Sequence, residues 1–161
     1  MRYLLLFFLF SIYSFGQDPY YISINKSNGL PSNIIYDAIQ DSQDFIWFAT
    51  SKGVCRIDGS QIKNIVSDNY ASRPASNLYE DCFGRIWYQD FNGNIFYIKN
   101  DVIHKFQKDK ANGFLRFGFI NNKLFIASKN SINIYDSANF DLIKSVPVDL
   151  KDIKQTIVFE D

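Results

Sequence analysis

The chain has 161 residues, of which 47% are hydrophobic, 17% aromatic and 21% charged, so it has the composition of one packed domain. Its 17 basic and 17 acidic side chains balance. This balance argues against nucleic-acid binding, which needs a basic surface, and against a polybasic membrane anchor. The 16 Phe, 10 Tyr and 2 Trp favour strands, so the composition predicts an all-β domain.

Residues 1–16 have the pattern of a secretory signal peptide. Arg2 provides a positive start, residues 3–13 are uncharged and rich in Leu and Phe, and the segment ends on the small residue Gly16. The apolar run is too short for a membrane span, which needs about 20 residues. We therefore expect cleavage after Gly16 and a secreted or periplasmic chain in an oxidising compartment.

A repeat organises the rest of the chain. Residues 41–48 (DSQDFIWF) align with 81–88 (DCFGRIWY) at an offset of 40, and 121–128 (NNKLFIAS) form a weaker third copy. Four short strands in about 40 residues indicate a β-propeller blade, and a solenoid of sheets is the alternative. We expect blades at about 29–66, 73–106 and 113–148, and the start of a fourth at 153–161.

The first copy shows how each blade is expected to form. Its strands are expected at about 34–40, 45–50, 54–58 and 61–66. In the first of these, strict alternation places Ile35 and Ile39 on the same face of the sheet as Asp37. Asp44 and Gly84 end equivalent hairpin turns, where a left-handed backbone is needed that Gly adopts freely and Asp tolerates.

The repeated residues have a structural interpretation. We expect the two tryptophans to pack between adjacent sheets, because large aromatic side chains dominate cores. A platform on which a ligand stacks is the alternative. The acidic residues and glycines are expected to form turns. The full set of structural repeat residues is Asp41, Asp44, Trp47, Gly53, Asp81, Gly84, Trp87 and Gly93.

The first copy resembles the two-component regulator propeller repeat, through GLPSN at 29–33, DFIWFAT at 44–50 and RIDG at 56–59. The resemblance covers 29–66 well, 73–106 moderately and 113–136 weakly. It implies a periplasmic sensor of a histidine kinase, with a membrane helix and the kinase following in the same chain.

The chain departs from the family pattern in two ways. Tyr88-Gln89 replaces the family's Gly-Thr pair in the second copy, and the third copy lacks the Trp. About three and a half blades fit the sequence, whereas propellers close with roughly four to eight. We therefore expect an open, partial β-propeller, the amino-terminal piece of a longer receptor. Its uncovered sheet faces should make it poorly soluble or self-associating.

The resemblance implies an extracytoplasmic sensory and ligand-binding module, the amino-terminal part of a two-component sensor histidine kinase. We expect no catalysis in this segment, no cofactor and no metal. The expected partners are a small molecule or glycan and the remainder of the receptor or a second copy, with membrane contact only through a downstream span. The alternatives are a stand-alone envelope interaction protein that oligomerises, and a fragment of a propeller hydrolase or lyase.

Propellers bind ligands at the mouth of the central channel, through the loops between strands. The candidate ligand residues there are Tyr88, Gln89, Asp90, Arg73 and Asn33. A tyrosine beside polar groups can stack on a sugar ring. The alternative is that these loops only join one blade to the next.

The remaining candidates have simpler explanations. Asp41 and Asp44 stand where a hairpin needs turn residues, although paired carboxylates also serve glycoside hydrolysis. His104 is expected on an exposed outer strand, without a nucleophile motif beside it. Cys55 and Cys82 lie at different positions in their blades, and the sequence leaves their pairing open.

Overall fold

The structure is a computed structural model that describes residues 21, 23–59, 61–67, 70, 73–106, 116–128 and 130–148. The expected signal peptide at 1–16 and the expected start of a fourth blade at 153–161 lie outside this part of the chain. Within it, no helix is long and apolar enough to span a membrane.

Three four-stranded antiparallel sheets make up the described chain, and each follows the chain order from one edge to the other. The first contains β1 (Ile35–Gln40), β2 (Ile46–Thr50), β3 (Gly53–Asp58) and β4 (Gln61–Ile65). The second contains β5 (Ala75–Glu80), β6 (Ile86–Asp90), β7 (Ile95–Lys99) and β8 (Val102–Lys105). The third contains β9 (Arg116–Ile120), β10 (Lys123–Ala127), β11 (Ser131–Asp136) and β12 (Leu142–Pro147). We call these sheets blades 1, 2 and 3.

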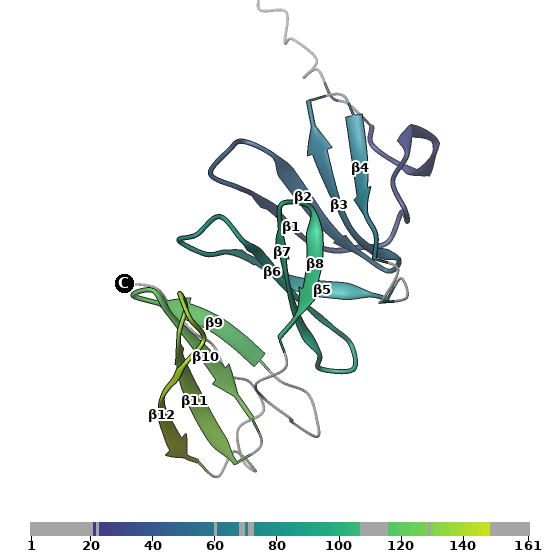
Figure 1. Ribbon diagram of the computed structural model, residues 1–161. Coiled ribbons are helices and arrows are strands. Elements are labelled where there is room, and N and C mark those ends of the chain that lie inside the picture. Colours follow the sequence, from purple (N-terminus) through teal and green to yellow (C-terminus); the bar gives the residue numbers. More distant parts are fainter. Residues whose placement is uncertain are drawn as a thin grey trace, which may run out of the picture.

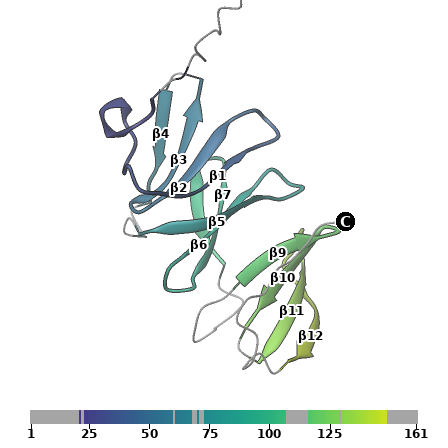
Figure 2. The same cartoon turned by 180° about the vertical axis from the view of Figure 1, so that it is seen from behind.

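The blades succeed one another along an open arc, as both views of the ribbon show (Figures 1 and 2). Blades 1 and 2 contact each other through β1, β2 and β5. A short 3-10 helix, η2 (Lys26–Asn28), precedes the first blade beside its outer strand β4. The expectation of an all-β chain with three four-stranded blades in an open arrangement is confirmed.

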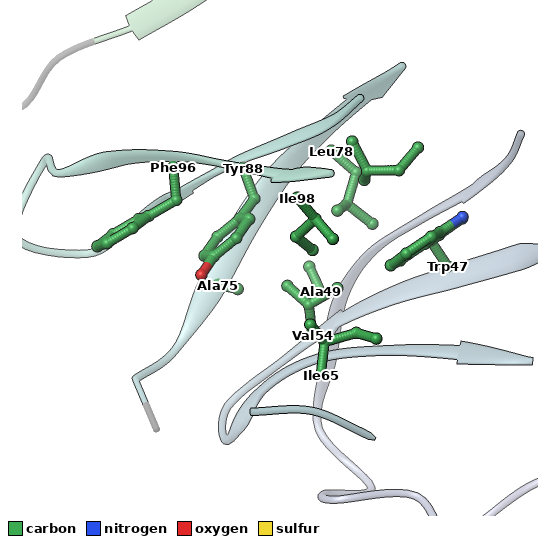
Figure 3. Close-up of a cluster of buried hydrophobic side chains, with 10 residues drawn as sticks. Trp47, Ala49, Val54, Ile65, Ala75, Leu78, Tyr88, Phe96 and Ile98 are labelled. Atoms are coloured by element: carbon green, nitrogen blue, oxygen red, sulfur yellow. The ribbon is translucent and has the colours of Figure 1, made fainter. Parts of the chain in front are cut away.

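The core between blades 1 and 2 is apolar and continuous (Figure 3). Trp47 lies at one end of it and the paired rings of Tyr88 and Phe96 lie at the other. Burying such a face stabilises the arc, at about 25 cal/mol for each Å² of apolar surface removed from water. The buried residues are Trp47, Ala49, Val54, Ile65, Ala75, Leu78, Ile86, Tyr88, Phe96 and Ile98.

The core between blades 2 and 3 is centred on Trp87, which is completely buried. Its indole lies within 5.0–6.1 Å of five other aromatic rings, measured between centroids. Edge-to-face and tilted contacts of this kind add about 0.5–1.5 kcal/mol per pair beyond simple burial. The surrounding rings belong to Tyr97, Phe106, Phe117, Phe119 and Phe140.

The first strand departs from the expected strict alternation. The pairing register between β1 and β2 shifts between Ile35 and Asp37, so the run of alternating faces is interrupted there. A β-bulge turns the affected side chain to a new direction. Asp37 uses it to accept a hydrogen bond at 2.7 Å from the backbone N–H of Leu78 in the next blade. The prediction of one face for Ile35, Asp37 and Ile39 is therefore wrong at the bulge.

A related connection follows between blades 2 and 3. Asn77, 40 residues after Asp37, lies at the bulge of β5 and donates through Nδ2 to the carbonyl of Phe117, at 3.4 Å. Polar side chains at the same position of the repeat thus join the first strand of each blade to the first strand of the next.

Candidate functional site

The two aspartates that open the hairpin turns hold the turns and the tryptophans together. Oδ1 of Asp41 accepts from the backbone N–H groups of Gln43 and Phe45, both at 2.9 Å. Its Oδ2 accepts from the indole N–H of Trp47 at 2.6 Å. The turn was predicted from the sequence but the indole contact was not, although the constant six-residue spacing from Asp to Trp in both copies signals it.

Asp81 repeats this arrangement in blade 2 with one more donor. Its Oδ1 accepts from the N–H groups of Phe83 and Arg85, at 2.9 and 3.0 Å. Its Oδ2 accepts from Nε of Arg85 at 2.6 Å and from the indole of Trp87 at 2.7 Å. Because the carboxylate is buried and saturated with donors, it fixes the hairpin and is not placed to transfer protons.

The last turn positions have the left-handed backbone that the sequence analysis expected. The φ angle is 66° at Asp44 and 68° at Gly84. At Gly53 and Gly93, in the next turn of each blade, φ is 111° and 82°. Only glycine adopts such angles without steric cost, which explains its place in both copies.

Three of the five candidate ligand residues meet at a cavity of about 140 Å³ between blades 1 and 2. Arg73 stands before β5, while Tyr88 and Asp90 belong to β6. Blade 1 contributes Lys52 from the turn between β2 and β3. The cavity therefore combines aromatic walls with two cationic side chains, one from each blade.

Asp90 holds the polar side of this cavity in place. It is 1% exposed. Its Oδ1 accepts from the N–H groups of Asn92 and Asn94, at 2.9 and 2.8 Å, and its Oδ2 accepts from the side-chain amide of Asn94 at 2.7 Å. Nη1 of Arg73 lies 3.3 Å from the same Oδ2. The carboxylate thereby orients a half-exposed guanidinium at the cavity.

Tyr88 is a packed wall of the cavity. Its ring stacks on Phe96, with 5.1 Å between centroids and 15° between planes. Burial is the largest cause that raises the pKa of its phenol above the ordinary value, and the nearby Asp90 carboxylate adds to the effect. The residue expected in an exposed loop is thus 7% exposed and lies in a strand.

The other two candidates lie elsewhere. Gln89 alternates with Tyr88 along β6 and is 2% exposed, so it lies inside the protein and does not line this cavity. Asn33 is exposed, and its Oδ1 accepts from the backbone N–H of Lys26 at 2.8 Å. Asn33 therefore ties the segment before β1 to η2.

A second cavity of about 260 Å³, which the sequence analysis missed, lies between blades 1 and 2 beside the aspartate turns. Arg56 reaches across from β3 and pairs with Asp101 of blade 2, with Nη1 and Oδ1 at 3.0 Å. Lys63 pairs with the other oxygen of Asp101 at 2.8 Å. The guanidinium also lies over the rings of Phe45 and Trp47, at 4.3 and 5.5 Å. These contacts join the two blades.

The thiols and the histidine have structural surroundings. Cys55 is completely buried in β3, and burial raises the pKa of its thiol from 9.0 to about 11. Cys82 is exposed, and both cysteines are free thiols. His104 lies in β8, is half-buried, and stacks on Tyr97 with 4.9 Å between ring centroids. Among the residues that the structure describes, no cluster of three His, Cys, Asp or Glu could hold a metal.

Comparison with known families identifies the first copy. Residues 29–52 match the family model described as two component regulator propeller. This match confirms the resemblance that the sequence analysis found. No functionally curated protein sequence matches the chain.

Solved structures share the fold at low sequence identity. The extracellular domain of BT4673 from B. thetaiotaomicron, a protein assigned to the hybrid two component systems, matches 76% of this chain with a TM-score of 0.63 and 17% identity. The corresponding domain of BT3049, with the same assignment, matches 77% with a TM-score of 0.59 and 19% identity. This chain spans 18% of either domain.

Virginiamycin B lyase from Staphylococcus aureus has the fold as well. It matches 78% of this chain with a TM-score of 0.56 and 18% identity, and this chain spans 44% of it. At such identities the likeness concerns the fold alone, because one fold carries many functions. The expectation of a partial β-propeller is confirmed.

Proposed function

We propose that this chain, which carries a repeat of the two component regulator propeller family at residues 29–52, is the extracytoplasmic sensory module of a two-component receptor. In this proposal the blades form the amino-terminal part of a sensor histidine kinase, and a membrane span and the kinase belong to the remainder of the receptor. The signal-peptide pattern at 1–16 supports export of the blades.

The observation that carries the proposal is the family match to the first blade, in a chain whose fold is that of the extracellular domains from B. thetaiotaomicron. We assign no catalytic step to the described residues. The carboxylates of Asp41, Asp81 and Asp90 are occupied by turn, indole and amide N–H groups, which leaves them poorly suited to general acid or base chemistry.

We place ligand contact at the cavity that contains Arg73, Tyr88 and Asp90. The ligand would lie against an aromatic wall and accept hydrogen bonds from a guanidinium that Asp90 orients, which suits a hydroxyl-rich or carboxylate-bearing ring. Because the cavity has walls from two blades, an occupant would favour one relative position of those blades. A downstream kinase can respond to such a population shift.

The test is a binding screen with neutral and acidic oligosaccharides, measured by calorimetry and by the shift in thermal unfolding midpoint. Arg73→Ala should weaken binding of any ligand found by at least about tenfold, because a charged hydrogen bond contributes roughly 1.5–3 kcal/mol. The variant should retain the unfolding midpoint of the unliganded protein, since the Arg73 side chain is 49% exposed.

Lys63→Ala is the matched control. Its side chain is 53% exposed and forms one ion pair, but at the second cavity. Equal losses of affinity in Arg73→Ala and Lys63→Ala would reject the proposed position of the site. The sensory proposal fails if no oligosaccharide binds and if the intact protein, isolated from the membranes of its source, contains no kinase in the same chain.

A further inference from the structure

The cavity of about 140 Å³ between blades 1 and 2, which we call the first cavity, has an excess of cationic side chains. Among its described lining residues, Lys52 and Arg73 are cationic and Asp90 alone is anionic. One positive charge therefore remains without a compensating carboxylate in the described lining. A ligand that carries a single negative charge would balance it.

The Asp90 carboxylate has no capacity left to accept a hydrogen bond from a ligand. Its Oδ1 accepts from two backbone N–H groups, those of Asn92 and Asn94. Its Oδ2 accepts from the side-chain amide of Asn94 and from Nη1 of Arg73. A carboxylate has about four lone-pair sites, so these contacts fill them. A ligand that must donate to a carboxylate would find none available here.

The charged groups that remain unengaged in the first cavity are donors. Arg73 uses Nη1 for Asp90, which leaves the edge formed by Nε and Nη2 without a described partner. Lys52 is exposed and forms no ion pair with a described residue. The other polar side chains of the described lining are hydroxyls, which can donate as well as accept.

The Tyr88 hydroxyl adds a buried donor. The residue is 7% exposed, and its hydroxyl forms no hydrogen bond with a described residue. Figure 3 shows this hydroxyl directed away from the Trp47 end of the core. Burial, and then the Asp90 carboxylate, raises the pKa of the phenol, so it keeps its proton near neutral pH. A buried hydroxyl without a partner gains from a ligand that accepts.

The repeat indicates that the turn after β6 does not need a charged side chain. Thr50 stands 40 residues before Asp90 and forms the equivalent turn in blade 1. Its Oγ1 accepts from the N–H of Lys52 at 3.1 Å and donates to the carbonyl of Gly53 at 2.8 Å. A neutral side chain thus closes the turn, so the charge of Asp90 serves to hold Arg73 instead.

The same comparison applies to the two other donors. Asn92 in blade 2 is equivalent to Lys52, and Phe48 in blade 1 is equivalent to Tyr88. Each equivalent residue forms the same turn or strand without the ammonium or the hydroxyl. The blade fold therefore does not require either group, although both line the first cavity.

We propose that the first cavity selects its ligand through one carboxylate group. This selection rests on the proposed ligand contact at the cavity and names the chemical class of that ligand. The carboxylate would accept a pair of hydrogen bonds from the free edge of Arg73 and would face the ammonium of Lys52 and the hydroxyl of Tyr88. A phosphate monoester, with close to two negative charges, would overcompensate the described lining beside Asp90.

The size of the cavity limits what enters with the carboxylate. Its volume of about 140 Å³ is several times the roughly 30 Å³ that a water molecule occupies in the liquid. There is room for the carboxylate and for the ring or chain that directly carries it. The rest of a larger ligand, such as an acidic oligosaccharide, would lie outside. Uronates and simple aromatic carboxylates share this chemistry, and the test separates them.

The test is calorimetry on the protein in the length that its own cell produces, with probes that differ only in charge. The pairs are galacturonate and galacturonamide, glucuronate and glucuronamide, and benzoate and benzamide. We expect at least one carboxylate to bind at least about tenfold more tightly than its amide, because hydrogen bonds to a charged group are stronger. Preference for a uronate over benzoate would identify a sugar acid, and the reverse a simple aromatic acid.

Variants assign the preference to this cavity. Lys52→Gln and Arg73→Gln should each reduce the preference for the carboxylate over its amide by about tenfold. Arg73→Lys should restore part of it, since the charge returns without the paired hydrogen bonds. Tyr88→Phe should weaken binding of the carboxylate several-fold. Lys63→Gln is the matched control, because Lys63 is an exposed cation at the second cavity. Circular dichroism checks that each variant folds.

Three results would overturn carboxylate selection. These are an amide that binds as tightly as its carboxylate, no binding of any carboxylate in the set at millimolar concentration, or an unchanged preference in Lys52→Gln. Tighter binding of sulfated galactose than of every carboxylate would also overturn it.

The sensory proposal fails by different results. Neutral oligosaccharides that bind with dependence on Arg73 would leave the proposed position of the site standing while carboxylate selection falls. Carboxylate selection in an intact chain that contains no kinase would leave the selection standing and remove the kinase link.

Discussion

At the scale of single residues, the buried aspartates of the turns are the most sensitive positions. Asp81→Ala would leave the Arg85 guanidinium and the Trp87 indole without their shared acceptor. We expect a loss of about 3–5 kcal/mol in the free energy of unfolding, the usual result of removing one partner from a buried ion pair. Urea titration followed by circular dichroism measures it.

Asp41→Ala is the comparison for that measurement. Asp41 pairs with no arginine among the described residues and is half-buried, so we expect a smaller loss of about 1–2 kcal/mol. Equal losses in the two variants would show that Arg85 adds nothing to the turn.

The left-handed turn positions should tolerate exchange between the copies. We expect Asp44→Gly and Gly84→Asp each to change the free energy of unfolding by less than about 1 kcal/mol. Both positions have a φ near 67°, and a Cβ at Gly84 would meet nothing within 4 Å. Gly84→Val, measured in the same urea titration, should cost clearly more because a branched side chain is strained there.

Stability should fall in alkaline solution because of Cys55. Its thiol has an ordinary pKa of 9.0 and a folded-state pKa of about 11, so the folded chain holds the proton more tightly. The contribution is complete below pH 9 and is lost as pH rises through 11, with a maximum of about 3 kcal/mol. Urea titrations at pH 8 and pH 11 should differ less for Cys55→Ala than for the unmodified chain, and an identical difference would contradict this origin.

The sequence predicted the role of some residues and missed that of others. The exchange of Asp44 for Gly84 was readable, because a turn restricts φ locally. The burial of Tyr88 was not, because it depends on Phe96 across the sheet and on the neighbouring blade. The bulge at Asp37 was equally hidden, since its benefit is a hydrogen bond to a residue 41 positions later.

At the scale of the elements, each blade interface has an arginine and an aromatic residue beside its tryptophan, but the turn and the third strand exchange these two residue types between blades 1 and 2. In blade 1 the turn supplies Phe45 and the third strand supplies Arg56 to the neighbourhood of Trp47. In blade 2 the turn supplies Arg85, whose guanidinium lies 5.6 Å from the ring of Tyr97 beside Trp87. At each tryptophan, the two exchanged positions together supply one cation and one aromatic ring.

These exchanged cations also reach the next blade. Arg56 pairs with Asp101 before β8, and Nη2 of Arg85 donates to the carbonyl of Ser137 after β11, at 2.5 Å. The exchange involves one position in the turn and one in the third strand of each blade. These positions are far apart in the sequence, so an alignment of the two copies shows them as two unrelated substitutions. Only the packed sheets reveal that one difference compensates for the other.

Trp87 should carry more of the stability than any other apolar residue of the second interface. Trp87→Ala removes a completely buried ring, so we expect a loss of about 3–5 kcal/mol in the free energy of unfolding. Val102→Ala, at an exposed position of the same blade, should stay within about 0.5 kcal/mol. Chemical denaturation of both variants measures this difference. A similar change in the free energy of unfolding in the two variants would mean that the interface does not stabilise the chain.

At the scale of the whole molecule, the middle blade should be the most protected from hydrogen exchange. All five residues of β6 are buried, whereas β1 and β12 are largely exposed. We expect amides of β6 and β7 to exchange slowest and those of β12 fastest. Equal protection of all three blades would contradict this order. Mass spectrometry of peptides resolves it.

The overall architecture was accessible from the sequence because the repeat spacing applies to the whole chain. The offset of 40 residues predicted four-stranded sheets, and the strands expected in the first copy lie within one residue of the observed boundaries. The cavities were not accessible in the same way. Each lies between blades and joins side chains whose separation depends on how neighbouring sheets twist and pack.

The hydrogen bonds between successive first strands bear on how the number of blades can change over evolutionary time. Blades 1 and 2 each carry a polar side chain, Asp37 or Asn77, that forms a hydrogen bond with the backbone of the next blade. Every blade has backbone groups whatever its sequence. A tandem duplication of the gene segment that encodes blade 1 or blade 2 would therefore produce a blade that can already form this hydrogen bond. A duplicate of blade 3 could not form it, because Phe117 occupies the position equivalent to Asp37 and Asn77. Addition of blades by recombination is thus easier through duplication of blade 1 or blade 2 than through duplication of blade 3.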